Sequence, residues 1–191
     1  MANEVNIEEL HQLILECQNG NGSAQERLYN GFVKKFFGVC LRYGADYAEA
    51  EDMLQEGFVK LFRKLEMYNF SGSFAAWASR LISNNCIDML RKKPNLYTLT
   101  EEKESSLESF SSEGIDDLYV EDLMNLVHQM PSGYRTVFNM YIVEGYSHRE
   151  IAERLNISEG TSKSQLNRAR KLLQSKLQEL KEIEVSKMIK G

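Results

Sequence analysis

The sequence predicts an all-α protein with two small helical domains joined by a flexible acidic linker. Only two prolines occur in 191 residues. Apolar residues recur every three to four positions, without sustained alternation of apolar and polar residues. At 42% hydrophobic and 10% aromatic residues, the chain can form packed cores. We expect domains at residues 1–94 and 118–181, a linker at 95–117 and a tail at 182–191.

The charge of the chain is segregated along the sequence. A net charge of −5 argues by itself against nucleic-acid binding. However, residues 67–95 carry a net charge of +3 and residues 146–181 carry +4, whereas residues 96–122 carry −8. The acidic segment also has five serines between positions 105 and 112, which is typical of a solvated tether. Mimicry of nucleic acid in a basic channel is the alternative use of such a segment.

Several classes of protein are not indicated by the sequence. It has no apolar run of about 18 residues and no signal-peptide pattern at its N-terminus, so we expect a cytoplasmic protein without membrane insertion. Its three cysteines lack metal-ligand spacing, and Cys40 and Cys86 are expected to pack as small apolar residues. No nucleophile–base pair, metal cluster or phosphate-binding loop is present, so we expect neither an enzyme nor a bound cofactor or metal.

Four helices are predicted in the first domain. Asn6 is a plausible N-cap for the first, and Ser23 with Glu26 forms a potential capping box for the second. The third begins around Asp46, and the fourth runs from about Phe74 to Lys93. These helices supply the apolar faces of one core.

The third helix has two distinct faces. A buried stripe is predicted from Leu54, Phe58, Leu61, Phe62 and Leu65. With this stripe buried, Asp52, Gln55 and Glu56 point toward another surface. From composition alone, the favoured interpretation is that these side chains are simply solvated. On the first helix, His11 lies beside the apolar face with no second metal ligand nearby, so we expect a structural role for it.

The loop at residues 67–73 and the following helix combine aromatic and basic residues. Tyr68 and Phe70 are expected to be exposed in the loop. Helical periodicity then aligns Trp77, Asn84, Asp88 and Arg91, with Arg80 beside them. Such a surface suits single-stranded nucleic acid, because unpaired bases stack on aromatic rings while cations follow the backbone. The alternative is that Trp77 belongs to the core and that Asp88 pairs with Arg91.

Residues 147–173 are predicted to form a helix-turn-helix, after two helices at about 117–130 and from Pro131 to Gly145 that close a second core. The second of these two helices is expected to bring Val137, Phe138, Tyr141 and Ile142 to that core. Ser147 and Glu150 have capping-box spacing. Asn156 tolerates the left-handed conformation at the corner, and Ser158 can cap the second helix.

The second of these helices has an inward and an outward face. The inward stripe is predicted to contain Ser162, Leu166, Ala169 and Leu173. The outward face is cationic and rich in amides: Ser164, Asn167, Arg168 and Lys171, flanked by Lys163, Gln165 and Arg170. Such side chains can neutralise phosphates and reach base edges in a major groove. A solvated polar face on an ordinary helical hairpin is the alternative.

Three segments, residues 46–65, 74–93 and 145–173, resemble the sigma factors of bacterial RNA polymerase. They resemble in particular the extracytoplasmic-function group, which keeps only the second and fourth conserved regions. The resemblance covers most of residues 8–178 in the family order. It implies that the acidic segment is the connector between the two regions, and that the partners are core RNA polymerase, promoter DNA as duplex and as melted single strand, and plausibly an anti-sigma factor.

The resemblance also assigns roles to residues selected above. The polymerase-docking residues would be Asp52, Gln55, Glu56 and Phe58. The residues that melt the minus-ten element would be Tyr68, Asn69, Phe70, Ser71, Trp77, Arg80, Asn84 and Arg91. The residues that contact the minus-thirty-five element would be Lys163, Ser164, Gln165, Asn167, Arg168 and Lys171.

The chain departs from the family pattern at three positions. Ser162 stands where an apolar residue is usual, Gln165 where a basic one is frequent, and Ala78 where leucine is common. Two other functions compete with that of a sigma factor. A conventional repressor or activator would bind palindromic duplex DNA without polymerase. A module that binds only proteins would have no promoter-dependent effect.

Overall fold

The computed structural model describes residues 7–93 and 126–190, with side chains up to Glu179. The chain divides into two compact units, Met1–Met89 and Leu90–Gly191. The elements in the described ranges are helices, which confirms the all-α class. None of these helices has the length and apolar character needed to cross a bilayer. The predicted linker, the Asn6 cap and the start of the helix at 117–130 lie outside the described residues.

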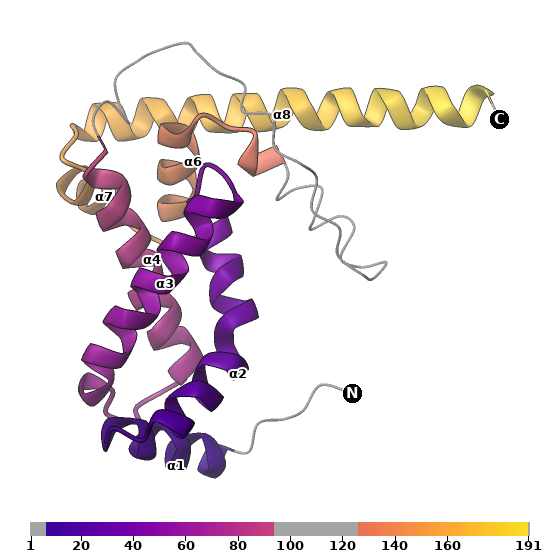
Figure 1. The fold of residues 1–191 in the computed structure, drawn as a ribbon. Coiled ribbons are helices and arrows are strands. Elements are labelled where there is room, and N and C mark those ends of the chain that lie inside the picture. Colours follow the sequence, from indigo (N-terminus) through magenta and orange to yellow (C-terminus); the bar gives the residue numbers. More distant parts are fainter. Residues whose placement is uncertain (1–6, 94–125, 191) are drawn as a thin grey trace. The chain divides into compact units, whose positions relative to one another are not determined.

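The first unit contains the four helices predicted for it (Figure 1). Short connections and one turn of 3₁₀-helix separate them. Their bounds are α1 (Ile7–Gln18), α2 (Gly22–Leu41), α3 (Tyr47–Lys64), η1 (Leu65–Met67) and α4 (Phe74–Arg91).

The starts of α2 and α3 both have capping residues. The third helix was expected to begin around Asp46, and Asp46 is the N-cap of α3: its Oδ1 accepts from the Glu49 amide at 2.8 Å. The Glu49 carboxylate in turn accepts from the Ala45 amide at 3.0 Å. The capping box predicted at Ser23 is wrong: Asn21 is the N-cap of α2, and its Oδ1 accepts from the Ala24 amide at 3.2 Å. Ser23 already lies in the first turn, so its hydroxyl comes too late to cap it.

Helices α3 and α4 approach each other closely at Gly57. A Cβ atom at this position would lie 2.6 Å from Cδ1 of Ile82, so a larger residue would require the end of the Ile82 side chain to shift. One turn away, the buried Asn85 amide donates to the Met53 carbonyl at 3.1 Å. Lys60 and Asp88 add an ion pair of 3.7 Å between the two helices. The relative position of α3 and α4 is therefore held by close packing and by polar contacts.

Cys40 of α2 and Cys86 of α4 meet in the core of this unit, with 3.9 Å between their sulfur atoms. Both thiols are reduced and fully buried, which confirms that they pack as small apolar residues. The hydrogen bond to Cys40 and burial both raise the pKa of the Cys86 thiol well above its usual value.

The second unit contains α6 (Ser132–Phe138), η2 (Asn139–Val143), α7 (His148–Leu155) and α8 (Glu159–Lys190). In Figure 1, α6 and α7 both pack on the N-terminal part of α8. The core between α6 and α8 is formed by Val127, Met130 and Ala169 together with Tyr134, Phe138, Leu172 and Leu173.

The segment η2 is a π-helical turn, and it changes the helical phase after α6. The sequence periodicity placed Ile142 on the same inward face as Val137 and Phe138. This prediction is wrong, because Ile142 is 47% exposed. The extra residue in the π turn rotates the following side chains away from the inward face of α6.

Arg135 is buried in this unit, and its Nη1 donates to the carbonyl oxygen of His128 at 2.8 Å. His128 is itself only 6% exposed. Burial, with the nearby Arg135 cation as the second cause, lowers the pKa of His128 to about 4. A histidine in this environment remains neutral at the pH of the cell.

Candidate functional site

The corner of the helix-turn-helix has the geometry predicted for it. The Ser147 amide donates to the Glu150 carboxylate at 2.8 Å, and the Glu150 amide returns a bond to the Ser147 hydroxyl at 3.3 Å. Asn156 has a φ of 54°, in the left-handed region, where asparagine is tolerated. The Thr161 amide donates to the Ser158 hydroxyl at 2.9 Å. The capping box, the corner and the second cap are confirmed.

The inward face of α8 holds this helix against α7. Ser162 is fully buried, as are Leu166 and Ala169. The Ser162 hydroxyl lies 2.9 Å from Nδ1 of His148, the first residue of α7. The His148 ring stacks on Tyr141 of η2 with 4.5 Å between centroids. These contacts connect η2, α7 and α8 at one point.

Gln165 is the one predicted minus-thirty-five contact that the structure places inside. It is 3% exposed, so its assignment to the outward face is wrong. The reason is the width of the inward stripe: Gln165 lies three residues after Ser162 and four before Ala169, hence on the same side of the helix. Its Oε1 atom has no hydrogen-bond partner among the described groups.

The other predicted contacts on α8 lie on an exposed face, and they are Lys163, Ser164, Asn167, Arg168 and Lys171. Two of the cations already have partners. Arg168 donates to the Tyr134 hydroxyl at 3.2 Å, and Lys163 pairs with Glu159 at 3.8 Å. Exposed contacts of this kind are weak and exchange readily for phosphate oxygens. The face presents cations, an amide and a hydroxyl side by side.

The loop before α4 is more ordered than the sequence indicated. Tyr68 was expected to be exposed, but it is buried, and its hydroxyl donates to the Gly72 carbonyl at 2.8 Å. The Ser71 amide donates to Oδ1 of Asn69 at 3.1 Å. Phe70 is half-buried with a φ of 60°, a left-handed conformation that costs a ring-bearing residue about 1 kcal/mol. Tyr68 is therefore a buried residue that holds the conformation of the loop.

The start of α4 continues this aromatic surface. Trp77 is half-buried, with its ring centroid 5.3 Å from Tyr68 and 5.8 Å from Phe74. One face of its side chain packs inward while part of it remains accessible, so it is neither a pure core residue nor a fully exposed platform. Further along the helix, Asn84 is half-buried, whereas Arg80 and Arg91 are exposed. The loop residues Asn69 and Ser71 are exposed as well.

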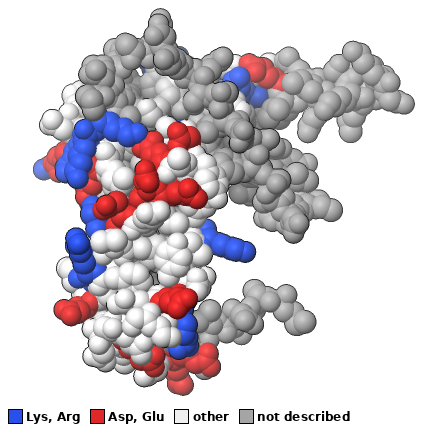
Figure 2. All heavy atoms as spheres, viewed as in Figure 1, with Lys and Arg blue, Asp and Glu red and all other residues white. Residues whose placement is uncertain are grey.

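The outward face of α3 is acidic, and Figure 2 shows acidic side chains gathered over this helix. Asp52, Gln55 and Glu56 are exposed on it. Phe58 was assigned to the same docking surface, but it is only 4% exposed, with its ring against Tyr29 at 4.5 Å and Phe62 at 6.0 Å. The assignment of Phe58 as a direct contact is wrong, because it belongs to the buried stripe that supports this face.

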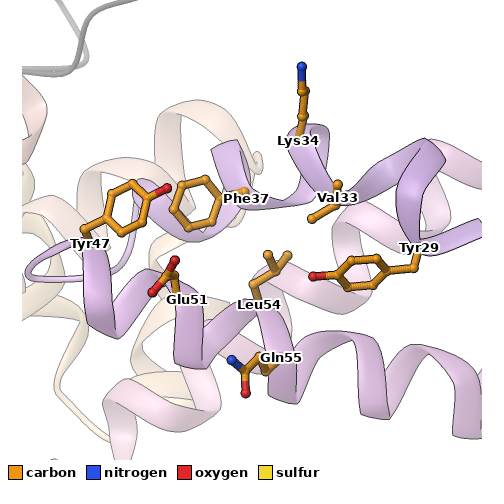
Figure 3. A pocket seen from close by; sticks show the side chains of 8 residues that line it. All are labelled: Tyr29, Val33, Lys34, Phe37, Tyr47, Glu51, Leu54 and Gln55. Atoms are coloured by element: carbon orange, nitrogen blue, oxygen red, sulfur yellow. The ribbon is translucent and has the colours of Figure 1, made fainter. Parts of the chain in front are cut away.

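Next to the acidic face lies a groove of about 350 Å³ between α2 and α3. Figure 3 shows that both helices contribute to it, with the Lys34 side chain extending away from the other groups. It is lined by Tyr29, Val33, Lys34, Phe37, Tyr47, Glu51, Leu54 and Gln55. Sequence reasoning missed this groove. The groove is marked in the structure by Tyr29 and Tyr47, two aromatic residues that are 36% and 48% exposed.

No group of three His, Cys, Asp or Glu side chains comes together as metal ligands would within residues 7–93 and 126–179. The surfaces described above are polar, charged and aromatic.

Comparisons with known proteins identify the family. A family model described as sigma-70 region 2 matches residues 28–94, and one described as sigma-70, region 4 matches residues 121–173. The ECF RNA polymerase sigma factor SigW of Bacillus subtilis is 30% identical over 179 residues, which cover 87% of this chain and 96% of SigW. The ECF RNA polymerase sigma-E factor of Haemophilus influenzae is 26% identical, over 88% of this chain and 95% of that protein. The RNA polymerase sigma-H factor of Pseudomonas aeruginosa is 27% identical, over 91% and 96%. This chain belongs to the extracytoplasmic-function sigma factors of RNA polymerase.

Proposed function

We propose that this sigma factor directs promoter-specific initiation through three surfaces, each carried by a different helix. The exposed face of α8 contacts the minus-thirty-five element. The loop at residues 67–73 and α4 open and hold the minus-ten element. The acidic face of α3, with the adjacent groove, binds core RNA polymerase. Polymerase supplies the catalysis and most of the nonspecific affinity for DNA.

The observation that carries the proposal is the two-sided character of α8. Its inward face is fully buried at Ser162 and Ala169, and its opposite face exposes Asn167, Arg168 and Lys171. A helix held in this way presents fixed side chains to a major groove, as recognition helices do. Arg168 and Asn167 are the best candidates for base contacts, whereas Lys163 and Lys171 suit phosphates.

For strand opening, the support is the accessible part of Phe70 and Trp77, with the exposed cation Arg80 one turn after Trp77 and the exposed cation Arg91 at the end of α4. Stacking of an unpaired base on an aromatic ring contributes about 1–3 kcal/mol, which offsets the few kcal/mol needed to unstack a step of duplex DNA. Asn69, Ser71 and Asn84 can donate to or accept from the base edges, and the arginines can follow the backbone.

For polymerase docking, the support is an acidic face next to an apolar groove. Asp52 and Glu56 attract a basic partner surface, and the groove lined by Tyr29 and Tyr47 can accept an apolar side chain from it. We expect Glu56→Lys to weaken the affinity for core polymerase about tenfold. Glu26→Lys makes the same change of charge at an exposed position on α2 and is the matched control, with an expected effect below twofold. Equal effects of the two variants would reject the docking face.

The most direct test of the function is run-off transcription across a genomic promoter library with purified core polymerase. Addition of the chain is expected to start transcription at a restricted set of promoters. If no promoter depends on the chain, the proposal fails. Tight, polymerase-independent binding of a twofold assembly to a palindromic duplex would favour a conventional repressor or activator instead.

A further inference from the structure

Helix α1 precedes the segment that matches sigma-70 region 2, which begins at residue 28. Nevertheless, α1 contacts the loop proposed to capture unpaired bases. Gln18, its last residue, donates from Nε2 to the Leu65 carbonyl of η1 at 2.9 Å. Seven residues earlier, the edge of the His11 ring contacts the Phe70 ring, with 5.0 Å between centroids and an interplanar angle of 73°. Both ends of the segment at residues 65–70 therefore contact α1.

Phe70 is the loop residue whose conformation most needs support. Its φ of 60° is left-handed, and a residue with a bulky ring stays in that region only where its surroundings hold it. Among the described residues, the rings of Tyr68 and His11 pack against it: Tyr68, at 5.2 Å, belongs to the loop itself, and His11 belongs to α1. The Tyr68 hydroxyl and the Asn69 carboxamide make contacts within the loop. His11 is thus the contact that fixes Phe70 to a neighbouring helix.

We propose that His11 is a positioning residue for strand opening, and that α1 pre-orients the loop that accepts an unpaired DNA base. This inference rests on the proposed function of the loop at residues 67–73. His11 itself does not touch DNA. Its edge-to-face contact keeps Phe70 in one conformation before DNA arrives, so that less conformational freedom is lost when a base stacks there.

The test compares templates that differ only in their need for strand opening. Holoenzyme is assembled with the full chain on a promoter that depends on it, as a fully paired duplex and with a premelted minus-ten region. Loss of one edge-to-face contact corresponds to a decrease of about 3- to 10-fold in the opening rate. We expect His11→Ala to slow initiation by this factor on the duplex, and by less than about twofold on the premelted template, where opening is no longer required.

Three further variants make the experiment specific. His11→Phe keeps an aromatic edge against Phe70 and is expected to restore opening. Gln12→Ala changes the next, exposed residue of α1 and serves as the matched control with wild-type opening. In a double-mutant cycle, Phe70→Ala is expected to make the additional effect of His11→Ala negligible, because the contact is already absent.

The inference is overturned if His11→Ala opens the duplex template at the wild-type rate, or if it lowers initiation equally on the two templates. Equal loss accompanied by a lower melting temperature would assign His11 a purely structural role. Failure to find any promoter whose transcription depends on the wild-type chain would instead reject the proposed function, before the two templates are compared. The two failures are therefore distinguishable.

Discussion

The Ser162 hydroxyl and Nδ1 of His148 lie 2.9 Å apart in the buried corner between α7 and α8. The serine is a departure from the apolar residue that is usual in the family, and here it forms a polar contact with the first residue of α7. The His148 ring also stacks on Tyr141 of η2. The Ser162 hydroxyl therefore holds the edge of the His148 ring, while Tyr141 holds its face. These two contacts link α7, α8 and η2 at one corner.

Removal of the buried Ser162 hydroxyl leaves Nδ1 of His148 without this partner in a partly buried corner. We therefore expect Ser162→Ala to lower the free energy of unfolding by about 1 kcal/mol in urea titrations at neutral pH. Ser175→Ala, on an exposed position of the same helix, is the control and should change it by less than about 0.5 kcal/mol. Additive effects of Ser162→Ala and His148→Ala would contradict the coupling.

His128 makes the second unit sensitive to acid. Its folded-state pKa is lowered to about 4 from an ordinary value of 6.5, so the unfolded chain binds more protons between these values. Stability that is present near neutral pH is therefore lost as the pH falls through this window. Between pH 7 and pH 5 we expect a loss of about 2 kcal/mol, measured by urea unfolding followed by circular dichroism. His128→Gln should reduce this dependence, and an unchanged pH profile would exclude His128 as its source.

Two residues of α8 test different properties of this helix. Arg168 tests DNA recognition by the exposed face, and Gln165 tests packing of the buried face. Arg168→Ala should weaken use of the minus-thirty-five element about tenfold while the melting temperature stays near that of the wild type. Gln165→Met should leave promoter choice unchanged and hold or raise stability, because it removes an amide oxygen that is buried without a hydrogen bond. Transcription from promoters with altered minus-thirty-five elements, together with thermal unfolding, tests both. A change of promoter preference in Gln165→Met would show that Gln165 does contact the minus-thirty-five element.

Trp77 is the single tryptophan of the chain, and it packs on the two rings that shape the loop. Trp77→Ala should reduce strand opening about tenfold, as measured by permanganate reactivity of unpaired thymines in the holoenzyme complex. Trp77→Phe keeps a ring for stacking and should be intermediate. Wild-type permanganate reactivity in Trp77→Ala would remove this residue from the opening surface.

The parts of the structure that were predictable from sequence depend on local chemistry. The capping box of Ser147 and Glu150 and the left-handed Asn156 involve neighbours within a few residues, so the sequence contains all the information they need. The inward positions Ser162 and Ala169 follow from helical periodicity alone. The cap of α2 was misplaced because Asn21 and Ser23 are both good N-cap residues, and spacing alone favoured the later one.

The wrong predictions share another cause, which is tertiary packing. Periodicity gives the direction of a helical stripe but not its width, so Gln165 was assigned to the exposed side although α8 buries it. Tyr68 is covered by the Phe74 ring of α4, and the π turn changes the phase at Ile142. The groove between α2 and α3 exists only once the two helices are placed against each other. None of these features can be obtained from one helix considered alone.

The packing at Gly57 connects the proposed polymerase-binding surface on α3 with the proposed DNA-melting surface on α4. The α3 helix bears the proposed polymerase contacts and α4 bears Trp77, and at Gly57 the α3 backbone lies close to the Ile82 side chain of α4. We expect polymerase bound to α3 to set the position of the α4 rings through this packing, the Asn85–Met53 hydrogen bond and the Lys60–Asp88 ion pair. On this proposal the base-stacking surface reaches the same place on every promoter, whichever sequence has been recognised upstream.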